Sequence, residues 1–395
     1  MRLSERVSRM KPSATMAMDA KAKDMVAEGK DVLSFALGEP DFPTPPDVCE
    51  AGIQAIRGGH TKYTPASGTV RLKKAICAAA ERDLGLTVTP AEICVGNGAK
   101  HILADIFGAM VNPGDHVILV APYWVSYADL IELFDGTFTA VEAPADRDFV
   151  PDIAAIEAAV TDRTIAVLIN SPSNPSGGVF AQEDIAALAD VAVRRNLTII
   201  SDEIYKHILF DGRAHFSPAM VSEEARKRTI IVDGVSKTYS MTGWRIGWSI
   251  APADFTKGLG TLQSQMTSNP NSIAQEAAAD ALLGPQDAVE AMRAEFGQRR
   301  DVIVGLLNAI PGVSCRRPGG AFYAFPDVSS YFGKTLRGRK IETSTDMSMY
   351  LLDEGLVSTV PGDAFGVTDN IRLSFACSTE DIRRGCERIA EALAG

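Results

Sequence analysis

The chain has 395 residues, of which 46% are apolar and 23% are charged, and its formal net charge at pH 7 is −11. This composition is typical of a globular enzyme, and a chain of this length more often forms two domains than one. The acidic balance argues against a surface that binds nucleic acid or an acidic membrane, but it leaves room for a basic pocket that binds a small anion.

The amino-terminal segment and the cysteines indicate the compartment. Residues 1–7 lack the apolar core of a signal peptide, and no apolar run approaches the length of a membrane span. The six cysteines are scattered, with no Cys-x-x-Cys pair and no histidine cluster nearby, so a zinc site is not expected. We therefore expect a cytoplasmic protein without a metal ion.

In chain order, the first two thirds of the sequence alternate between strand-like and helix-like patterns. Apolar residues recur at helical spacing in three segments, at 102–110, 127–134 and 185–192. Short apolar runs typical of strands lie between and around them, at 93–95, 116–120, 165–169, 197–200, 230–232 and 245–250. This alternation predicts an α/β fold with a mostly parallel central sheet covered by helices.

The pattern changes after about residue 269. Helical patterns at 277–282 and 302–307 precede a glycine turn, a helix at 349–352 and a strand at 371–375, which together indicate a smaller α+β domain. The first forty or so residues are expected to pack against it. The predicted division is an N-terminal segment (1–45), a large domain (46–290) and a small C-terminal domain (291–395).

Polar side chains follow three of the predicted strands. The pairs are Asn170 and Asn174, Asp202 and Tyr205, and Ser236 and Lys237. In parallel α/β sheets, ligands bind beyond the carboxyl ends of the strands. We therefore expect the three pairs to meet at one cavity.

Lys237 is the most informative residue of the chain. It follows an apolar run and Gly234, and Arg245 lies on the same segment. A lysine that forms a Schiff base must lose its proton, which partial burial and a nearby cation promote. This setting favours a covalent anchor for an anionic aldehyde; the alternative is a solvated loop lysine, since most lysines are exposed.

Asp202 and Asn174 each have two interpretations. Asp202 either caps the following helix or keeps the nitrogen of a pyridine ring protonated, which makes the ring a strong electron sink. Tyr205 would then donate to the phenolate oxygen of the same ring. Asn174 lies between Pro172 and Pro175, in a segment that is either a plain turn or a rigid support for the asparagine side chain.

An anion site is indicated at residues 96–100, which follow a strand and open a helix, because backbone N–H groups at a helix start suit a phosphate. A dinucleotide fingerprint would need glycine at His101, which argues against a dinucleotide oxidoreductase. Arg245 and Arg372 are either structural charges or clamps for an anion. Trp124 is either a core aromatic or a surface that stacks on a flat ring.

Together these segments resemble the class I aminotransferases, the pyridoxal-phosphate enzymes of the aspartate aminotransferase fold, and within them the bacterial aspartate and aspartate/prephenate subgroup. The resemblance runs over nearly the whole chain, and its carriers are residues 38–42, 62–65, 123–127, 173–177, 201–205, 236–237 and 241–247. One position departs from it: Gly234 stands where many relatives carry serine, three residues before Lys237.

The resemblance implies how pyridoxal 5′-phosphate would be held. Lys237 would bind it covalently and later carry the α-proton, Asp202 would pair with the ring nitrogen, and Trp124 would stack on the ring. Tyr205 and Asn174 would contact the phenolate oxygen. The residues implied around the phosphate are Gly98, Ala99, Lys100, Ser236, Arg245 and, across a homodimer interface, Tyr63.

The resemblance also implies the substrates. Arg372 would clamp the α-carboxylate, with Asn174, Trp124 and the backbone of Gly38 beside it. Lys11 and Thr15 would face the distal group, although Lys11 also reads as a solvated loop lysine. The implied reaction is ping-pong transamination between an L-amino acid, aspartate or glutamate, and a 2-oxo acid, 2-oxoglutarate or oxaloacetate. The alternatives are action on prephenate, aromatic amino acids or alanine, a pyridoxal-phosphate lyase, and a regulator built on the same fold.

Overall fold

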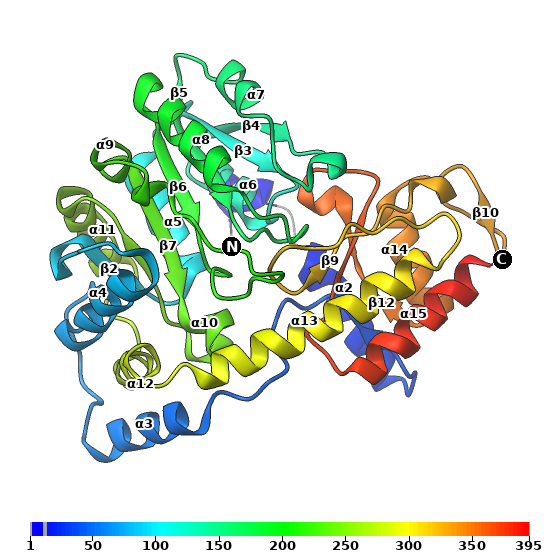
Figure 1. The fold of residues 1–395 in the computed structure, drawn as a ribbon, viewed down its shortest axis with the longest axis horizontal. Helices are drawn as coiled ribbons and strands as arrows, with labels where there is room; N and C mark the ends of the chain where they lie inside the picture. Colours follow the sequence, from blue (N-terminus) through cyan, green and yellow to red (C-terminus); the bar gives the residue numbers. More distant parts are fainter. Residues whose placement is uncertain (1, 11–13, 395) are drawn as a thin grey trace.

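The computed structural model describes residues 2–10 and 14–394, and its centre is a seven-stranded sheet in the order β2-β8-β7-β6-β5-β3-β4 (Figure 1). Neighbouring strands are parallel except around β8, which runs antiparallel to β2 and β7. The strands are β2 (Ile93–Gly96), β3 (His116–Ala121), β4 (Thr137–Glu142), β5 (Thr164–Asn170), β6 (Thr198–Asp202), β7 (Thr229–Gly234) and β8 (Gly247–Ile250). The predicted mostly parallel sheet is confirmed.

Helices cover both faces of this sheet. They are α3 (Pro46–Arg57), α4 (Val70–Leu84), α5 (Ala99–Met110), α6 (Ser126–Leu133), α7 (Ile153–Ala158), α8 (Gln182–Arg195), α9 (Glu223–Arg226), α10 (Val235–Thr238), α11 (Ala253–Met266) and α12 (Ser272–Leu283). Successive side chains of a strand point to opposite faces. Accordingly Val117 and Leu119 of β3 pack with the residues of α5 and α6, whereas Ile118 packs with those of α8. Burial on both faces explains the uninterrupted apolar runs of these strands.

A second, smaller group of elements forms its own core, in which Phe322, Tyr350, Leu351, Phe375 and Ile382 are buried. Strands β13, β14 and β9 make an antiparallel sheet, and β1 from the N-terminal segment pairs with β12. The elements are α2 (Ala14–Ala27), β1 (Leu33–Ser34), β9 (Tyr323–Ala324), β10 (Thr335–Leu336), β11 (Arg339–Lys340), α14 (Ser344–Gly355), β12 (Val357–Ser358), β13 (Val360–Pro361), β14 (Ile371–Ser374) and α15 (Thr379–Leu393), and the short helix α1 (Glu5–Arg9) precedes them in the chain.

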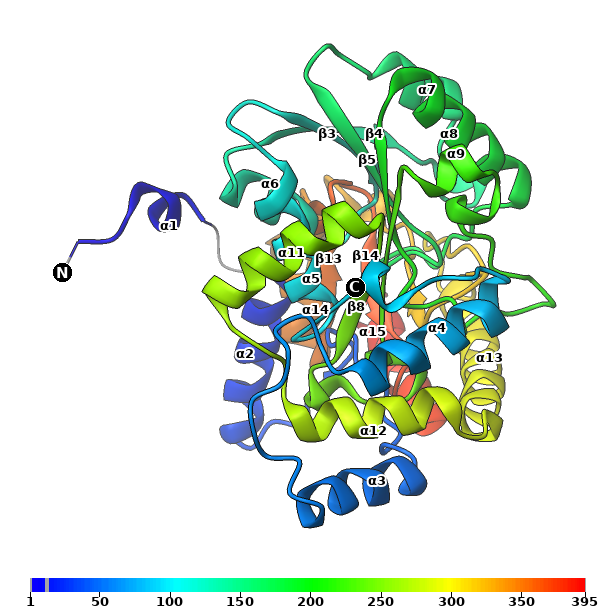
Figure 2. The ribbon, with the colours of Figure 1, turned by 90° about the vertical axis from the view of Figure 1, so that its left-hand side faces the viewer.

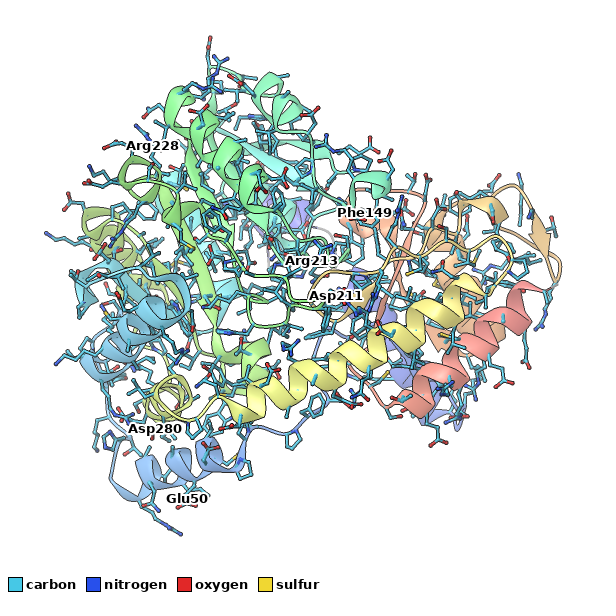
Figure 3. All side chains as sticks on the ribbon, in the orientation of Figure 1. Glu50, Phe149, Asp211, Arg213, Arg228 and Asp280 are labelled. Atoms are coloured by element: carbon cyan, nitrogen blue, oxygen red, sulfur yellow. The ribbon has the colours of Figure 1, made fainter. Side chains whose placement is uncertain are left out.

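Helix α13 (Asp287–Asn308) runs from beneath the large sheet into the second group of elements (Figure 1). Arg300, near its middle, holds Asp211 with two hydrogen bonds of 2.7 and 3.0 Å, and Asp211 lies on the loop between β6 and α9 (Figure 3). Such a fork-to-fork pair fixes geometry as well as charge. It ties the loops of the large sheet to the helix that leads away from it.

The first helix, α1, stands clear of the body (Figure 2). Its Arg6 guanidinium lies 3.0 Å from the carboxylate of Asp135, while Leu3 and Val7 are exposed. Among the described residues, no helix combines the length and the apolar character needed to cross a membrane.

Candidate active site

The loops that follow β5, β6 and β7 meet at a cavity of about 320 Å³. The three predicted pairs contribute to its wall as expected: Asn170, Asn174, Asp202, Tyr205, Ser236 and Lys237 all line it. Gly38, Ala99, Lys100, Trp124, Arg245 and Arg372 complete the predicted set that lines this cavity. A parallel sheet brings its strand ends to one edge, so residues scattered over the chain form one site.

Lys237 lies in the single turn of α10, directly after β7. Its amine donates to the backbone carbonyl of Gly38, and no carboxylate of the described residues lies within ion-pair distance of it. Partial burial lowers the pKa of this amine to about 8, and the positive charges of Arg372 and Arg245 act in the same direction. About a tenth of the amine is therefore unprotonated at pH 7, far more than for an ordinary lysine, and only the unprotonated form is a nucleophile.

Asp202 ends β6 and is buried. Its Oδ2 accepts a hydrogen bond of 2.6 Å from the hydroxyl of Tyr127, and its Oδ1 accepts one of 3.2 Å from the backbone N–H of Ile204. Burial nevertheless raises the pKa of Asp202 to about 6. A carboxylate with this affinity for a proton, facing a cavity, suits a protonated ring nitrogen. Tyr127 was read from the sequence only as part of a helix face, because its hydroxyl contact depends on tertiary structure.

Tyr205 and Asn174 are also held by neighbours. The Tyr205 hydroxyl lies 2.7 Å from that of Tyr323, a cavity residue that no sequence motif singled out. The Asn174 backbone N–H donates to the side chain of Asn170 at 2.7 Å, and the Asn174 carboxamide oxygen accepts from Arg372 at 2.9 Å. The Asn174–Pro175 bond is cis. Asn174 is thus a buried, oriented polar group rather than a solvated turn residue.

Arg372, on β14, is a buried cation without a carboxylate partner among the described residues, and it is only 2% exposed. Its guanidinium lies between the rings of Tyr323 and Phe365, at 4.6 and 5.1 Å, and donates to the carbonyl of Ala36. Its Nε has no partner among the described residues, and burial lowers its pKa. Such a group is costly to bury unless a ligand anion completes it.

The start of α5 forms an anion cradle. Gly98 has φ +90°, and a Cβ there would lie 2.5 Å from the guanidinium of Arg245, so glycine lets the arginine approach the helix start. Arg245 donates only to the backbone carbonyls of Thr242 and Asn97 among the described residues. The Lys100 amine lies 4.8 Å from the centre of the Trp124 ring. Free helix N–H groups and two cations suit a phosphate.

The packing around Gly234 accounts for the glycine at this position, where many relatives carry serine. A Cβ at this position would lie 2.8 Å from the carbonyl oxygen of Ile246 and 3.2 Å from the Ile204 side chain. A serine would need the neighbouring strand to move. The serine hydroxyl available next to Lys237 is that of Ser236, which lines the cavity.

Three predicted residues do not appear among those that line the cavity. Tyr63 is 92% exposed and does not line the cavity of its own chain. Lys11 lies outside the described residues. Thr15 falls in the first turn of α2, and the next residue, Met16, lines the cavity.

A second hollow, of about 390 Å³, lies over the start of β7 and the end of β8. Its charged residues include Glu92 and Arg226, which pair with each other at 3.2 Å. The described residues contain no group of three or more histidine, cysteine or acidic side chains able to hold a metal ion. The chemistry of the chain therefore centres on the cavity around Lys237.

Comparison with known proteins shows the family of the chain. The profile of the family described as "Aminotransferase class I and II" matches residues 30–389. The chain is 45% identical to an aspartate/prephenate aminotransferase of Cereibacter sphaeroides, covering 100% of this chain and 99% of that protein. It is 44% identical to an aspartate aminotransferase of Bacillus sp. strain YM-2, with 98% of each covered.

Solved structures agree as well. The aspartate aminotransferase of Rhizobium meliloti superimposes with a TM-score of 0.96 at 41% identity, covering 100% of this chain and 99% of that one. The Thermus thermophilus enzyme with maleate gives 0.93 at 40%, covering 99% and 100%. The chain belongs to the class I and II aminotransferases. It is an aminotransferase, and enzymes of this family work with pyridoxal 5′-phosphate.

The residues present fit that cofactor. The cavity offers a lysine amine of lowered pKa for the aldehyde and a buried carboxylate with raised pKa for the ring nitrogen. At the start of α5, Gly98 has no Cβ and so leaves room for the Arg245 guanidinium beside free backbone N–H groups. A phosphate would bind there.

Proposed function

We propose that this enzyme transfers the amino group between aspartate or glutamate and the 2-oxo acids oxaloacetate and 2-oxoglutarate, by a ping-pong mechanism. The observation that carries the proposal is one cavity that holds Lys237, Asp202 and Arg372, with Arg372 lacking a carboxylate partner among the described residues. Relatives at 40–45% identity over nearly the whole chain carry the names aspartate or aspartate/prephenate aminotransferase, which supports this choice.

In this proposal the chain would hold the cofactor at five places. Lys237 would bind the aldehyde carbon, Asp202 would accept a hydrogen bond from the ring nitrogen, and Trp124 would cover the ring. Tyr205 and Asn174 contact the phenolate oxygen. The phosphate is held by Gly98, Ala99, Lys100, Ser236, Arg245 and the partner subunit's Tyr63. The bound cofactor supplies a carbonyl for the substrate amine and an electron sink for the bond that breaks at the α-carbon.

The chain's own residues then orient the amino acid and move its proton. Arg372, aided by Asn174, Trp124 and the backbone of Gly38, clamps the α-carboxylate through two parallel hydrogen bonds. Once the substrate amine has replaced it at the cofactor, the Lys237 amine would be free to take the α-proton. It would then return this proton to the cofactor carbon that carried the aldehyde. A base with a pKa of about 8 is well matched to both transfers.

The distal carboxylate is assigned to the region where α2 begins. Lys11 would pair with it and Thr15 would donate a hydrogen bond to it, which suits aspartate and glutamate. Lys11→Met is then expected to raise KM for aspartate at least about tenfold while leaving KM for alanine nearly unchanged. Equal effects on both amino acids would remove Lys11 from the substrate site.

Prephenate is the second candidate substrate, favoured by the relative named aspartate/prephenate aminotransferase. The visible spectrum of the purified protein tests both candidates. Aspartate and glutamate are expected to bleach the cofactor absorbance, and product analysis should show the matching oxo acid. Bleaching by other amino acids only, or release of products from elimination or decarboxylation, would overturn the proposed reaction.

We further propose a homodimer in which Tyr63 reaches the phosphate site of the partner subunit. The 92% exposure of Tyr63 and the exposed apolar residues Val7, on the projecting α1, and Leu3, just before it, support an interface. Mixing Lys237→Ala with Tyr63→Ala chains tests it, because one site of each hybrid dimer would then be intact. Regained activity supports shared sites, whereas no regain would place Tyr63 in its own protomer's site or in none.

The compartment and domain division are proposals too. All six cysteines are free thiols, which supports work in the reducing cytoplasm. The division at 1–45, 46–290 and 291–395 is supported by the pairing of β1 with β12, and its second boundary falls within α13.

A further inference from the structure

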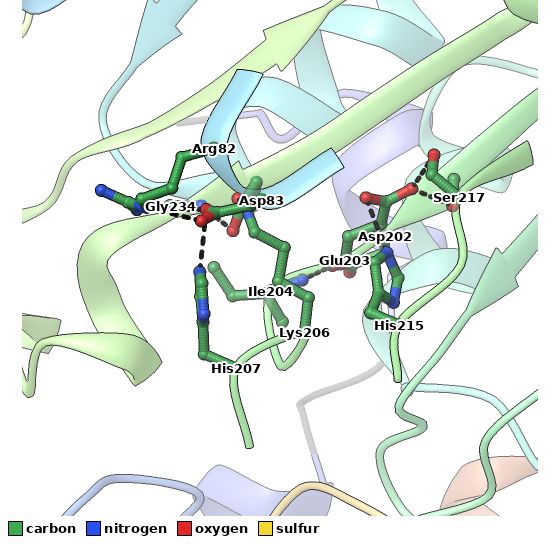
Figure 4. Close-up of polar contacts among 12 residues, drawn as sticks. Arg82, Asp83, Asp202, Glu203, Ile204, Lys206, His207, His215, Ser217 and Gly234 are labelled. Atoms are coloured by element: carbon green, nitrogen blue, oxygen red, sulfur yellow. Dashed lines mark hydrogen bonds and ion pairs between the residues drawn. The ribbon is translucent and has the colours of Figure 1, made fainter. Parts of the chain in front are cut away.

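A buried carboxylate, Glu203, lies directly behind Asp202. Figure 4 shows it beside Ser217 and His215, and it does not line the cavity. Its Oε1 accepts hydrogen bonds from Ser201 at 2.8 Å and Ser217 at 2.6 Å, and its Oε2 lies 2.9 Å from Nε2 of His215. Burial alone would raise the pKa of Glu203, but His215 and Ser217 outweigh it and hold the pKa below its usual value. Glu203 is therefore ionised.

The side chain of Glu203 has three polar partners among the described residues, and none of them is a lysine or an arginine. Two are the hydroxyls of Ser201 and Ser217, which donate to Oε1. The third is His215, whose Nε2 lies at ion-pair distance from Oε2, although neither atom has an aligned hydrogen-bond partner among the described residues. Two hydroxyls and one imidazole are therefore the groups that hold this buried acid.

The chain connects this cluster to the active site. Asp202 and Glu203 are neighbours whose side chains point to opposite sides, as alternation along an extended chain requires. The Glu203 backbone is also tied down, because its N–H donates to Val232 at 2.8 Å and its carbonyl accepts from Lys206 at 2.9 Å. Glu203 is thus held by its backbone bonds and by its side-chain contacts, and it directly follows Asp202 in the chain.

Glu203 also affects the pKa of Asp202 through its charge. Tyr127 donates to Asp202 from the cavity side, which lowers its affinity for a proton, whereas Glu203 and Asp233 act in the opposite direction. The charge of Asp233 is paired with the buried amine of Lys206. That leaves Glu203 as the acid behind Asp202 without a lysine or arginine in contact.

We propose that Glu203, held by His215, is a positioning residue that strengthens the hold of Asp202 on the protonated ring nitrogen of the cofactor. The inference rests on the role proposed above for Asp202. Glu203 lies outside the cavity wall and touches neither substrate nor cofactor, so it acts only through its neighbour. Loss of the Glu203 carboxylate would make the ring nitrogen of the cofactor lose its proton more easily, without removing any contact in the cavity.

The test compares the wild type with Glu203→Gln, in which amide oxygen replaces carboxylate oxygen and the charge is lost. Both proteins are loaded with pyridoxal 5′-phosphate that carries ¹⁵N in the ring, and the ¹⁵N shift is followed against pH. In Glu203→Gln the ring nitrogen should lose its proton at a pH lower by about one unit or more. Glu224→Gln, which removes the same charge from an exposed side chain, should match the wild type.

A second readout separates this role from a purely structural one. Affinity is measured by absorbance titration for pyridoxal phosphate and for its 1-deaza analogue, which has carbon in place of the ring nitrogen. Glu203→Gln should bind the normal cofactor about tenfold or more weakly and the analogue as tightly as the wild type does. An unshifted ¹⁵N titration, or equal weakening for both compounds, would overturn the proposal.

His215→Gln serves if Glu203→Gln fails to fold, since loss of the imidazole lets Glu203 take up a proton more readily. It should shift the ring titration in the same direction by a smaller amount, and no shift would count against the proposal. A wild-type protein that binds no cofactor, or binds it with an unprotonated ring nitrogen at all pH values, would instead overturn the function proposed above.

Discussion

Lys237 and Lys206 follow neighbouring strands of one sheet, yet they have opposite acid–base character. Burial lowers the pKa of Lys237 to about 8, because its amine meets a backbone carbonyl rather than an acid. Burial also acts against the charge of Lys206, but Asp233 and Asp83 outweigh it and raise the pKa of that amine. The contrast shows that the partner, more than the depth of burial, decides whether a buried lysine is a nucleophile or a structural cation.

The carboxylates repeat the contrast. Burial raises the pKa of Asp202 to about 6, since hydrogen bonds alone oppose it. Burial would raise the pKa of Asp83 too, but His207 at 3.1 Å and Arg82 at 2.7 Å hold it well below its usual value (Figure 4). The cavity side of the strand ends therefore carries charges that a ligand must complete, whereas Lys206, Asp233 and Asp83, outside the cavity, are already paired.

The largest expected effect is that of Lys237→Ala. Turnover should fall by at least about 10⁴-fold, because both the covalent anchor and the proton carrier are lost. Cofactor binding should weaken but persist through the phosphate cradle. Steady-state kinetics and equilibrium dialysis measure the two effects, and a variant with normal rates would refute the assignment of Lys237.

Asp202→Asn comes next, with a loss of about 10²–10⁴-fold in kcat. The apoprotein should become more stable at pH 8, by roughly 2–3 kcal/mol at most. The reason is that burial raises the pKa of Asp202 by about two units, so the charged carboxylate destabilises the folded state at this pH. Because the pKa of Asp202 is higher in the folded state than in the unfolded state, the buried group does not destabilise the protein at a pH below the unfolded pKa. It destabilises the folded state progressively as the pH rises, and fully above the folded pKa of about 6. The gain should therefore disappear near pH 4, and urea titrations at both pH values check it.

Lys206→Met should reverse this pattern. It leaves Asp233 and Asp83 buried without their lysine, which costs about 3–5 kcal/mol of unfolding free energy, while kcat per folded molecule changes little. Lys227→Met removes a lysine that is 57% exposed and should change stability by less than about 0.5 kcal/mol. A Lys206 variant that is stable but inactive would contradict the assignment of Lys206 as a structural cation and Lys237 as the nucleophile.

The smallest effect is a pH dependence. The rate at which the apoprotein captures pyridoxal phosphate should rise with pH and level off with a midpoint near 8, because only the unprotonated Lys237 amine attacks the aldehyde. Stopped-flow absorbance measures it. A midpoint near 10.5, the ordinary lysine value, would show that the cavity does not lower the pKa of Lys237.

Much of this arrangement follows from the sequence. The apolar runs predicted the parallel strands, and the rule for strand ends predicted the meeting of Asn174, Asp202 and Lys237. Helix α13 was predicted only over 302–307, although it spans Asp287–Asn308, because Arg299 and Arg300 are buried and break the apolar pattern. Local patterns thus located the main groups of the cavity.

What the sequence did not reveal depends on contacts between distant residues. Tyr127 and Tyr323 act through hydroxyls whose partners are 75 and 118 residues away, and their apolar surroundings resemble an ordinary core. Glu203 was hidden beside Asp202 for the same reason. The roles proposed for Tyr63 and Lys11 involve a second subunit and a substrate, so they stay predictions.

The central claim is that the Lys237 amine forms the carbon–nitrogen bond to the cofactor aldehyde. Reduction of the loaded protein with borohydride, followed by digestion and mass spectrometry of the peptides, tests it most directly. The account predicts one phosphopyridoxyl group per chain, on the peptide that contains Lys237. A label on Lys100 or Lys206 instead, or no label on a protein saturated with pyridoxal phosphate, would contradict it.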